Sequence, residues 1–504
     1  MQAFFDAAKN GDIKQLRRFV NGTADLNDKD KYGNTALILS AWNGNTECAQ
    51  MLVDAKADIN AKDKDGDTAL ILAINQGKNK CTQLLVDAKA NIEAKDEDGT
   101  TALVWAARMG NAECVSLLVA AKADLESQDE VSNTALILAA SEGHSECVQL
   151  LVDANADVNA KNGESATALL WAALEDHFEC VQLLVDANAD VHAQDQSNRT
   201  ALSLVAAKGD TKCARALIAA KANVNVRDSF GHSALLLAAQ NDHPECVQLL
   251  IDAKADLDLR DNEGNAPLTL ALKECNMDCT RLLILAKADV RATRGERETA
   301  LIMTACAGDT ECVQQLITAK VDVNAQNLPR YTALIVAADE GRRDCVQLLL
   351  DARAGLDFQD YAGNTALILA ASKGHFECVQ LLVAAKADVN ITVDYGNTAL
   401  ILVARKDDTV SMQQLIAAKA NLEAKSNDGR TALLWAACAG NMAHVRLLVT
   451  ANASLDSVDN NGHTALMLAA NNGNRDCVRT LLALATEFFS VRPSKKRKPM
   501  RDHK

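Results

Sequence analysis

Cysteine is the residue type whose number could support chemistry, because fifteen thiols could form disulfides, bind a metal or act as nucleophiles. Twelve of them are separated by 33 residues or a multiple of 33: Cys48, Cys81, Cys114, Cys147, Cys180, Cys213, Cys246, Cys279, Cys312, Cys345, Cys378 and Cys477. Equivalent positions on stacked helices lie about 8 to 10 Å apart, whereas a disulfide needs Cα atoms within about 7 Å. We therefore interpret the twelve as small buried hydrophobic residues with reduced thiols.

The other three cysteines, Cys275, Cys306 and Cys438, lie outside this spacing and could be exposed. A reactive thiol would require a lowered pKa; an inert surface thiol is the alternative. The sequence contains no Cys-x-x-Cys and no histidine pair at i, i+4, so we expect no metal site. It also contains no glycine-rich phosphate loop and no Gly-x-Ser-x-Gly elbow. We therefore predict that the protein is not an enzyme and binds no cofactor.

The spacing of the cysteines belongs to a repeat that extends through the whole chain. Thr-Ala-Leu occurs at residues 35, 68, 101, 134, 167, 200, 299, 332, 365, 398, 431 and 464, and related triplets begin at residues 233 and 266. Gln2-Ala3-Phe4 lies one period before the first triplet. One such unit is too small to bury its own apolar face, so neighbouring units must stack into a continuous core.

Residues 360–392 show what one unit encodes. Residues 360–363 predict a turn, and Thr365 is a good N-cap for a first helix rich in leucine and alanine. Gly374 ends that helix, and a second helix is expected from about Phe376, with apolar residues at i, i+3 and i+4. An extended segment at 387–390 leads to the next turn.

The motif Gly-x-Thr-Ala-Leu-x-Leu-Ala-Ala-x-x-Gly-His-x-Glu-Cys-Val-x-Leu-Leu-Val, followed by Ala-Asp-Val-Asn, resembles the ankyrin repeat over about residues 2–486. The resemblance implies an all-α repeat solenoid of stacked helix-turn-helix units with short β-turn fingers. We expect an N-terminal capping repeat at residues 1–29, fourteen 33-residue repeats at 30–491 and a basic disordered tail at 492–504. The resemblance also implies a structural hydrogen-bonding role for His144, His177, His243 and His375, which share the turn between the two helices.

The chain departs from the ankyrin pattern at the end of the second helix, where the family usually has glycine. Lysine, arginine or asparagine stands there instead: Lys56, Lys89, Lys122, Asn155, Asn188, Lys221, Lys254, Lys287, Lys320, Arg353, Lys386, Lys419 and Asn452. If the backbone keeps the left-handed conformation, each Cβ costs on the order of 1 kcal/mol, and less for asparagine. A different helix cap is the alternative.

Partners of ankyrin-repeat proteins lie on the concave side, formed by the finger tips and the first helices. Positions that vary between units of this chain are therefore candidates for binding a partner: Tyr32, Asn34 and Trp42, and later Arg108 and Met109. Aromatic and arginine side chains are frequent interface anchors. Trp105, Trp171 and Trp435 replace the second leucine of the first helix, so we interpret them as core residues.

A basic stretch interrupts the acidic repeats near the middle of the chain. It combines Arg227, Arg260, Arg291, Arg294, Arg297, Arg330 and Tyr331. We expect an acidic peptide or loop as the partner segment here. The alternative is that these residues have no role in binding and reflect neutral sequence drift in a finger that tolerates substitution.

Charge limits the remaining possibilities. The formal net charge of -15 argues against nucleic acid as a partner, because phosphate backbones are held mainly by lysine and arginine. The tail is basic, and Lys495, Lys496, Arg497 and Lys498 between two prolines resemble a nuclear-import signal. A solvating or membrane-adjacent tail, or one that contacts nucleic acid, is the alternative.

The sequence contains no apolar run of ~18 residues and no basic start followed by an apolar segment, so we expect neither membrane insertion nor a secretory signal peptide. The expected location is cytoplasmic, or nuclear if the tail is an import signal. We predict a monomeric, non-catalytic scaffold or adaptor that binds a protein partner of unknown identity through its concave surface. The alternatives are a substrate-recruiting subunit of an enzyme complex, a secreted effector with the same array, and a structural spacer.

Overall fold

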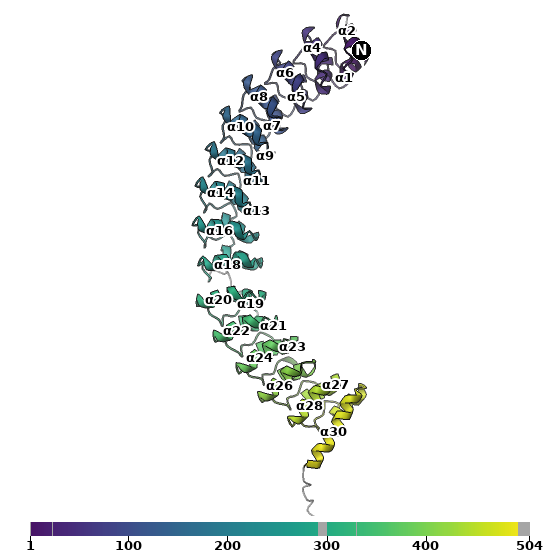
Figure 1. Cartoon of the computed structure of the whole chain (residues 1–504), viewed down its shortest axis with the longest axis vertical. Coiled ribbons are helices and arrows are strands. Elements are labelled where there is room, and N and C mark those ends of the chain that lie inside the picture. Colours follow the sequence, from purple (N-terminus) through teal and green to yellow (C-terminus); the bar gives the residue numbers. More distant parts are fainter. Residues whose placement is uncertain (1, 23, 291–299, 329, 492–504) are drawn as a thin grey trace, which may run out of the picture. The chain divides into compact units, whose positions relative to one another are not determined.

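The computed structural model describes residues 2–22, 24–290, 300–328 and 330–491, with side chains as far as residue 486. Its residues form two compact units, Met1–Pro267 and Leu268–Lys504. In the described residues the regular structure is helical, and within each unit the helices are stacked in consecutive pairs (Figure 1). The structure therefore confirms the all-α repeat solenoid.

Every pair in the first unit contains a first and a second helix joined by a short turn. The first helices are α1 (Gln2–Asn10), α3 (Ala36–Asn43), α5 (Ala69–Asn75), α7 (Ala102–Arg108), α9 (Ala135–Ser141), α11 (Ala168–Leu174), α13 (Ala201–Lys208) and α15 (Ala234–Gln240). The second helices are α2 (Ile13–Val20), α4 (Thr46–Asp54), α6 (Asn79–Asp87), α8 (Ala112–Ala120), α10 (Ser145–Asp153), α12 (Phe178–Asp186), α14 (Thr211–Ala219) and α16 (Pro244–Asp252).

The second unit repeats this arrangement. Its first helices are α17 (Pro267–Lys273), which begins at the last residue of the first unit, α19 (Ala300–Ala307), α21 (Ala333–Asp339), α23 (Ala366–Lys373), α25 (Ala399–Ala404), α27 (Ala432–Ala439) and α29 (Ala465–Asn471). Its second helices are α18 (Met277–Leu285), α20 (Thr310–Thr318), α22 (Arg343–Asp351), α24 (Phe376–Ala384), α26 (Thr409–Ala417), α28 (Met442–Thr450) and α30 (Arg475–Val491). A 3₁₀ turn, η1 (Asp394–Gly396), lies in one finger.

Threonine fixes the start of most first helices. The Thr365 hydroxyl accepts a hydrogen bond from the backbone N–H of Ile368 at 3.3 Å, which satisfies one of the free donors at the start of α23. Gly374 ends that helix with a positive φ of 86°, and α24 begins at Phe376 as predicted. The local signals read from residues 360–392 are therefore confirmed.

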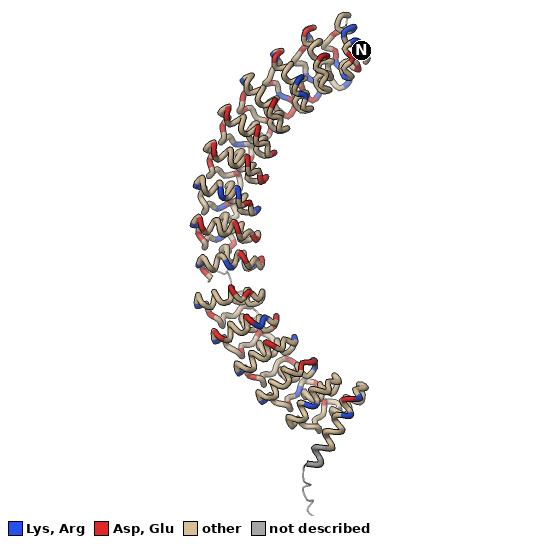
Figure 2. Tube along the Cα trace, in the orientation of Figure 1, with Lys and Arg blue, Asp and Glu red and all other residues tan. Residues whose placement is uncertain are grey.

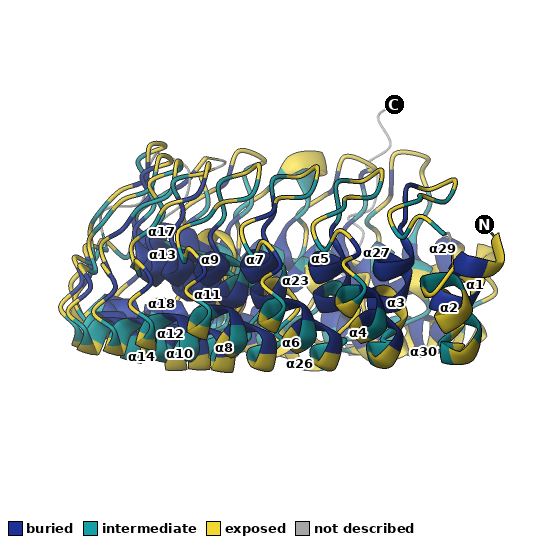
Figure 3. Cartoon of the chain, turned by 90° about the horizontal axis from the view of Figure 1, so that it is seen from above, coloured by how far each residue is buried: buried dark blue, intermediate teal, exposed yellow. Residues whose placement is uncertain are grey.

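The core lies between the first helices and the inner side of the second helices. Small alanines let the first helices pack closely, and α3 is buried from Ala36 to Ala41. The second helices add a repeated cysteine and leucine, as in Cys147 and Leu151 of α10. All twelve regularly spaced cysteines are buried. Burial raises the pKa of the Cys147 thiol to about 11, as expected for a structural rather than a reactive cysteine. Figure 3 shows the buried first helices between exposed finger tips and exposed outer ends of the second helices.

The end of the second helix keeps the left-handed conformation at all thirteen positions where this chain lacks glycine. After α4, Lys56 has φ of 67°, its N–H donates to Val53 O at 3.0 Å, and the Ala57 N–H donates to Leu52 O at 3.0 Å. These two bonds define a Schellman motif, which normally favours glycine at the left-handed residue. The second helices therefore end in the same cap that glycine would form. The lysine, arginine and asparagine residues adopt a left-handed conformation that is unfavourable for a residue with a Cβ.

Hydrogen bonds between the fingers of neighbouring 33-residue repeats hold the fingers together. In the first unit, a backbone N–H of each finger donates to a carbonyl near the tip of the preceding finger, from Lys64 N to Tyr32 O (3.2 Å) through to Asn262 N to Phe230 O (2.9 Å). A second link joins residues 31 apart, as where the Asp190 N–H donates to Asn159 Oδ1 at 2.8 Å. These links fix the position of each finger relative to its neighbours and explain why asparagine and acidic residues recur there.

Candidate partner-binding site

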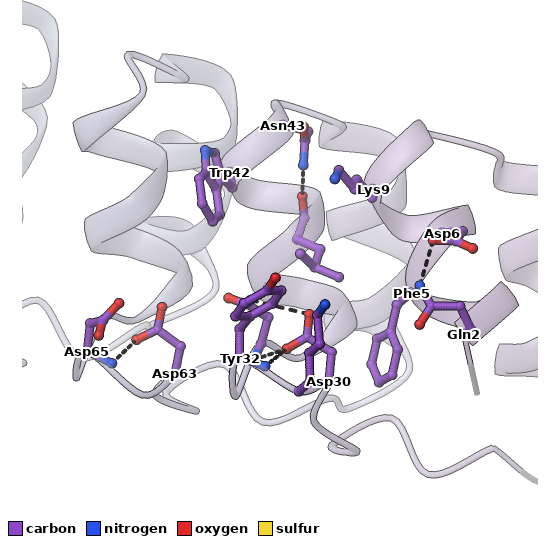
Figure 4. Close-up of a pocket in the computed structure, with 13 residues that line it drawn as sticks. Gln2, Phe5, Asp6, Lys9, Asp30, Tyr32, Trp42, Asn43, Asp63 and Asp65 are labelled. Carbon is purple, nitrogen blue, oxygen red and sulfur yellow. Dashed lines mark hydrogen bonds between the residues drawn. The ribbon is translucent and has the colours of Figure 1, made fainter.

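A cavity of about 500 Å³ opens at the start of the first unit. It lies between α1, α3, the first finger, which carries Asp30 and Tyr32, and the second finger, which carries Asp63 and Asp65. Its lining includes the aromatic rings of Phe5, Tyr32 and Trp42 and the carboxylates of Asp6, Asp30, Asp63 and Asp65, together with Lys9 and Lys31 (Figure 4). Two residues that the sequence singled out separately, Tyr32 and Trp42, therefore border one space. We call it the N-terminal cavity.

The first finger presents Tyr32 in a fixed backbone conformation. Asp30 Oδ1 accepts hydrogen bonds from the N–H groups of Tyr32 (2.8 Å) and Asn34 (2.9 Å), which close the turn. Gly33 has φ of 87°, and a Cβ there would lie 2.8 Å from Lys64 N, so only glycine lets the second finger approach this closely. The Tyr32 side chain is nevertheless 60% exposed. Its ring is thus held at the cavity without being buried.

Trp42 lies in the last turn of α3 and is 42% exposed, as expected of a surface residue. Asn34 corrects another expectation: it is only 4% exposed, and its Nδ2 donates to Asp30 Oδ2 at 3.3 Å. It stabilises the turn and does not contact solvent enough to anchor a partner.

The charges around the N-terminal cavity are mostly negative. Within the described part of the chain, its four carboxylates form no ion pair, and Lys31 Nζ lies 4.7 Å from the centroid of the Tyr32 ring. Figure 2 marks acidic residues along the first unit, with lysine and arginine interspersed. Burial raises the pKa of the Asp63 carboxyl, although backbone hydrogen bonds and Lys29 act in the opposite direction.

Asp67 adds a further carboxyl group to the second finger, close enough to the other carboxylates for their repulsion to affect its pKa. Burial is the main reason that its pKa rises to about 7, and Asp63, Asp96, Asp65 and Asp98 raise it further. The equivalent position carries asparagine in several other fingers, where the amide donates to the turn aspartate, as in Asn364 Nδ2 to Asp360 Oδ2 at 3.0 Å. An ionised Asp67 cannot donate in this way.

Arg108 and Met109 are exposed at the end of α7, and Arg108 occupies the same repeat position as Trp42. The guanidinium carbon of Arg108 lies 5.4 Å from the centroid of the Trp105 ring. Trp105 also donates its Nε1–H to Asp96 Oδ2 at 2.6 Å. The arginine and the tryptophan therefore form one patch between helix and finger.

The prediction that Trp105, Trp171 and Trp435 are core residues is wrong, because all three are half-buried. This position of the first helix is only partly covered in other repeats as well, since Leu138, Leu237 and Leu369, which occupy it there, are also half-buried. Trp435 has two cations on its ring, with the guanidinium carbons of Arg405 and Arg430 at 4.6 and 4.8 Å from the centroid. Sequence reasoning missed Arg405, although aligning the units on Thr-Ala-Leu places it at the position of Trp42 and Arg108.

The described part of the basic stretch is not a group of free cations. Arg227 Nε donates to Gly231 O, and Arg260 Nη1 donates to Gly264 O, both at 3.0 Å, so each arginine supports its own finger. Arg330 is exposed in the second unit, and Tyr331 beside it is half-buried, with burial as the main reason for its raised pKa. Arg291, Arg294 and Arg297 lie outside the described residues, so the acidic-partner hypothesis stays a prediction.

The three cysteines outside the regular spacing differ in exposure: Cys275 and Cys306 are exposed, and Cys438 is half-buried. Burial, followed by Glu340, raises the pKa of the Cys306 thiol, which is opposite to the change that reactivity requires. Each of the four turn histidines forms a hydrogen bond through Nε2 with a backbone carbonyl of the preceding repeat, as in His177 Nε2 to Ser141 O at 3.1 Å. This contact agrees with a structural role. No group of three or more metal-ligating side chains occurs among the residues that the structure describes.

Comparison with protein families agrees with this architecture. The family described as ankyrin repeats (3 copies) matches residues 55–129, 85–162, 121–195, 202–294, 268–360 and 400–490, and the family described as ankyrin repeats (many copies) matches 20–73 and 356–403. The chain belongs to the ankyrin-repeat family. Ankyrin repeats are generally protein-interaction modules. No curated protein matches the chain.

Two sequence expectations concern membranes and the nucleus. A search of the described residues finds no helix with both the length and the apolar character needed to span a bilayer. Lys495, Lys496, Arg497 and Lys498 lie outside the described residues, and their role in nuclear import stays a prediction.

Proposed function

We propose that this protein is a non-catalytic scaffold or adaptor that binds a partner protein through its finger face, meaning the finger tips together with the first helices. Membership of the ankyrin-repeat family supports the binding role. The proposed organisation is a capping repeat at residues 1–29, fourteen repeats at 30–491 and a basic tail at 492–504.

The observation that carries this proposal is the presence of large apolar side chains at finger tips. Five tips present such a residue: Tyr32, Val131 and Phe230 in the first unit, and Tyr361 and Tyr395 in the second, all at least 60% exposed. Most other repeats carry aspartate, glutamate, serine or asparagine at the position of Tyr32. Exposed aromatic side chains on a fixed backbone lose little conformational freedom when a partner covers them, and such residues are frequent interface anchors.

The spacer alternative makes a different prediction. A spacer needs only stacked repeats, so it should tolerate replacement of the finger-tip residues by the polar residues found in other units. A recruiting subunit or a secreted effector would use the same face, and these two alternatives differ from the scaffold only in what the partner does.

Affinity capture with three forms of the full chain tests the proposal. One form is unchanged, one carries Tyr32→Asp, Phe230→Ser and Tyr395→Asp, and one carries Gln149→Ala and Gln182→Ala, at half-buried positions of the second helices α10 and α12, as a control. We expect a partner to bind the unchanged chain and the control and to be lost from the finger-tip variant, and this difference must persist with purified components. Equal binding to all three forms, or no partner at all, would contradict the proposed face.

A further inference from the structure

We propose that the N-terminal cavity receives a cationic side chain, lysine or arginine, from a basic segment of the partner protein. This inference rests on the proposed scaffold function and adds the chemistry of one anchor. It differs from the acidic segment expected for the basic stretch, because it concerns another set of residues.

The aromatic rings of the cavity supply the first reason. Lys31 Nζ already lies over the Tyr32 ring, 4.7 Å from its centroid, so the cavity includes a ring that attracts a cation. Trp42 has the larger and more electron-rich ring, is 42% exposed, and has no cation over it within the described part of the chain. Indole is the best of the aromatic side chains for this contact. Of the two rings that border the cavity, Tyr32 therefore already has a lysine over it, and Trp42 is available for a second cation.

The carboxylates supply the second reason. Four of them line the cavity against two ammonium groups, so the excess charge is negative. Asp63 and Asp65 border it from the second finger, next to the first finger that carries Tyr32 (Figure 4). An apolar or acidic segment entering here would remove water from these carboxylates without replacing it, whereas a cation would compensate them.

The neighbouring acidic residues make a cation still more favourable. Asp67 belongs to the same finger as Asp63 and Asp65, and repulsion between these carboxylates adds to burial in raising the pKa of Asp63 and Asp67. A positive charge beside Asp63 and Asp65 would reduce the repulsion. The binding energy would therefore include relief of an unfavourable interaction that is present in the free protein.

The size of the cavity limits the occupant. Its volume of about 500 Å³ is near the lower end of the range for ligand pockets, roughly 300–1,000 Å³. It fits one long side chain with its adjacent backbone and not a whole helix. An extended basic segment that inserts one lysine or arginine matches both this volume and the negative charge.

Fluorescence anisotropy with the full-length protein tests this inference. The probe is a fluorescein-labelled peptide in which arginines alternate with Gly-Ser pairs, and its twin carries glutamine in place of each arginine. The test variants are Trp42→Ala and the pair Asp63→Asn with Asp65→Asn. Other units of this chain carry alanine or asparagine at these repeat positions, in Ala207, Asn162 and Asn461, so the substitutions suit the fold.

The control must separate the cavity from the general acidity of a chain with net charge -15. Asp153→Asn with Asp186→Asn removes the same number of carboxylates from exposed positions in the last turns of α10 and α12. Trp171→Ala removes a tryptophan from another unit. Circular dichroism and urea unfolding check that all variants fold.

We expect each test variant to weaken binding of the arginine peptide about tenfold, the scale of one desolvated cation–π or charge contact. The controls should change it less than about twofold, since exposed charges contribute little, and the glutamine peptide should not bind. Equal weakening by the charge control, or unchanged binding to Trp42→Ala, would overturn the cation site. A purified partner that still binds the cavity variants but is lost from the finger-tip variant would overturn this inference while leaving the scaffold function intact.

Discussion

Replacing Asp67 by asparagine should stabilise the second finger, and the gain should depend on pH. In the native protein this carboxyl has a pKa of about 7 instead of 3.8, with burial as the largest cause. Because the pKa is raised, the folded state favours the protonated form, so stability is lost as the pH rises from about 4 to about 7. The full shift corresponds to roughly 4 kcal/mol, but Asp67 is partly exposed, so screening reduces this to on the order of 1 kcal/mol.

The asparagine should also donate to Asp63, as Asn364 donates to Asp360 at 3.0 Å. We therefore expect Asp67→Asn to gain about 1–2 kcal/mol above pH 7 and much less at pH 4. Hydrogen–deuterium exchange of the amides of residues 63–67, combined with urea unfolding of the full chain, measures this gain at both pH values.

The reverse substitution is the matched control. Asn364→Asp places a second carboxylate beside Asp360 and should destabilise that finger above pH 7 more than at pH 4. The explanation from burial and carboxylate repulsion is refuted if Asp67→Asn gives no gain, or a gain that is the same at pH 4 and pH 8.

Three further predictions concern the repeat framework. Lys122→Gly should raise the free energy of unfolding in urea by about 0.5–1 kcal/mol, because removing the strain of a left-handed residue with a Cβ outweighs the added entropy of the unfolded chain. Asn155→Gly should change it by only a few tenths of a kcal/mol, since asparagine tolerates this conformation. Equal effects of the two substitutions would contradict the strain argument. Asn159→Ala should cost about 1 kcal/mol, since the Asp190 N–H loses its acceptor at 2.8 Å, and an unchanged exchange rate of that amide would argue against the link. A thiol reagent should modify Cys275 and Cys306 in the folded protein and the twelve buried cysteines only after unfolding; rapid native-state reaction of Cys147 would contradict its buried position.

The repeated elements of the fold could be predicted from the sequence because their signals are local. Thr365 as N-cap, Gly374 as helix end and the start of α24 at Phe376 each depend on a few neighbouring residues. The burial of the regularly spaced cysteines followed from their shared position in the repeat and the apolar character of a free cysteine. The left-handed backbone at Lys56 was left open between two alternatives, since the side chain itself disfavours the conformation that the unit requires.

The candidate site was less predictable because it depends on contacts between units. Tyr32 and Trp42 were singled out as variable positions, but two of the carboxylates beside them, those of Asp63 and Asp65, come from the next finger, about one period along the chain. Trp435 was assigned to the core because leucine usually stands there, and its contacts with Arg405 and Arg430 depend on the length of the indole. The raised pKa of Asp67 likewise requires the positions of acidic residues in two fingers.

The most direct test of the scaffold proposal is site-specific photo-crosslinking from the two faces of the protein. A photoreactive p-benzoylphenylalanine replaces Phe230 at a finger tip in one sample and Phe376 at the start of α24 in another, both exposed in the native protein. Binding through the finger face predicts a crosslinked partner from position 230 and little or none from position 376. A partner that crosslinks only from position 376, or equally from both positions, would contradict it.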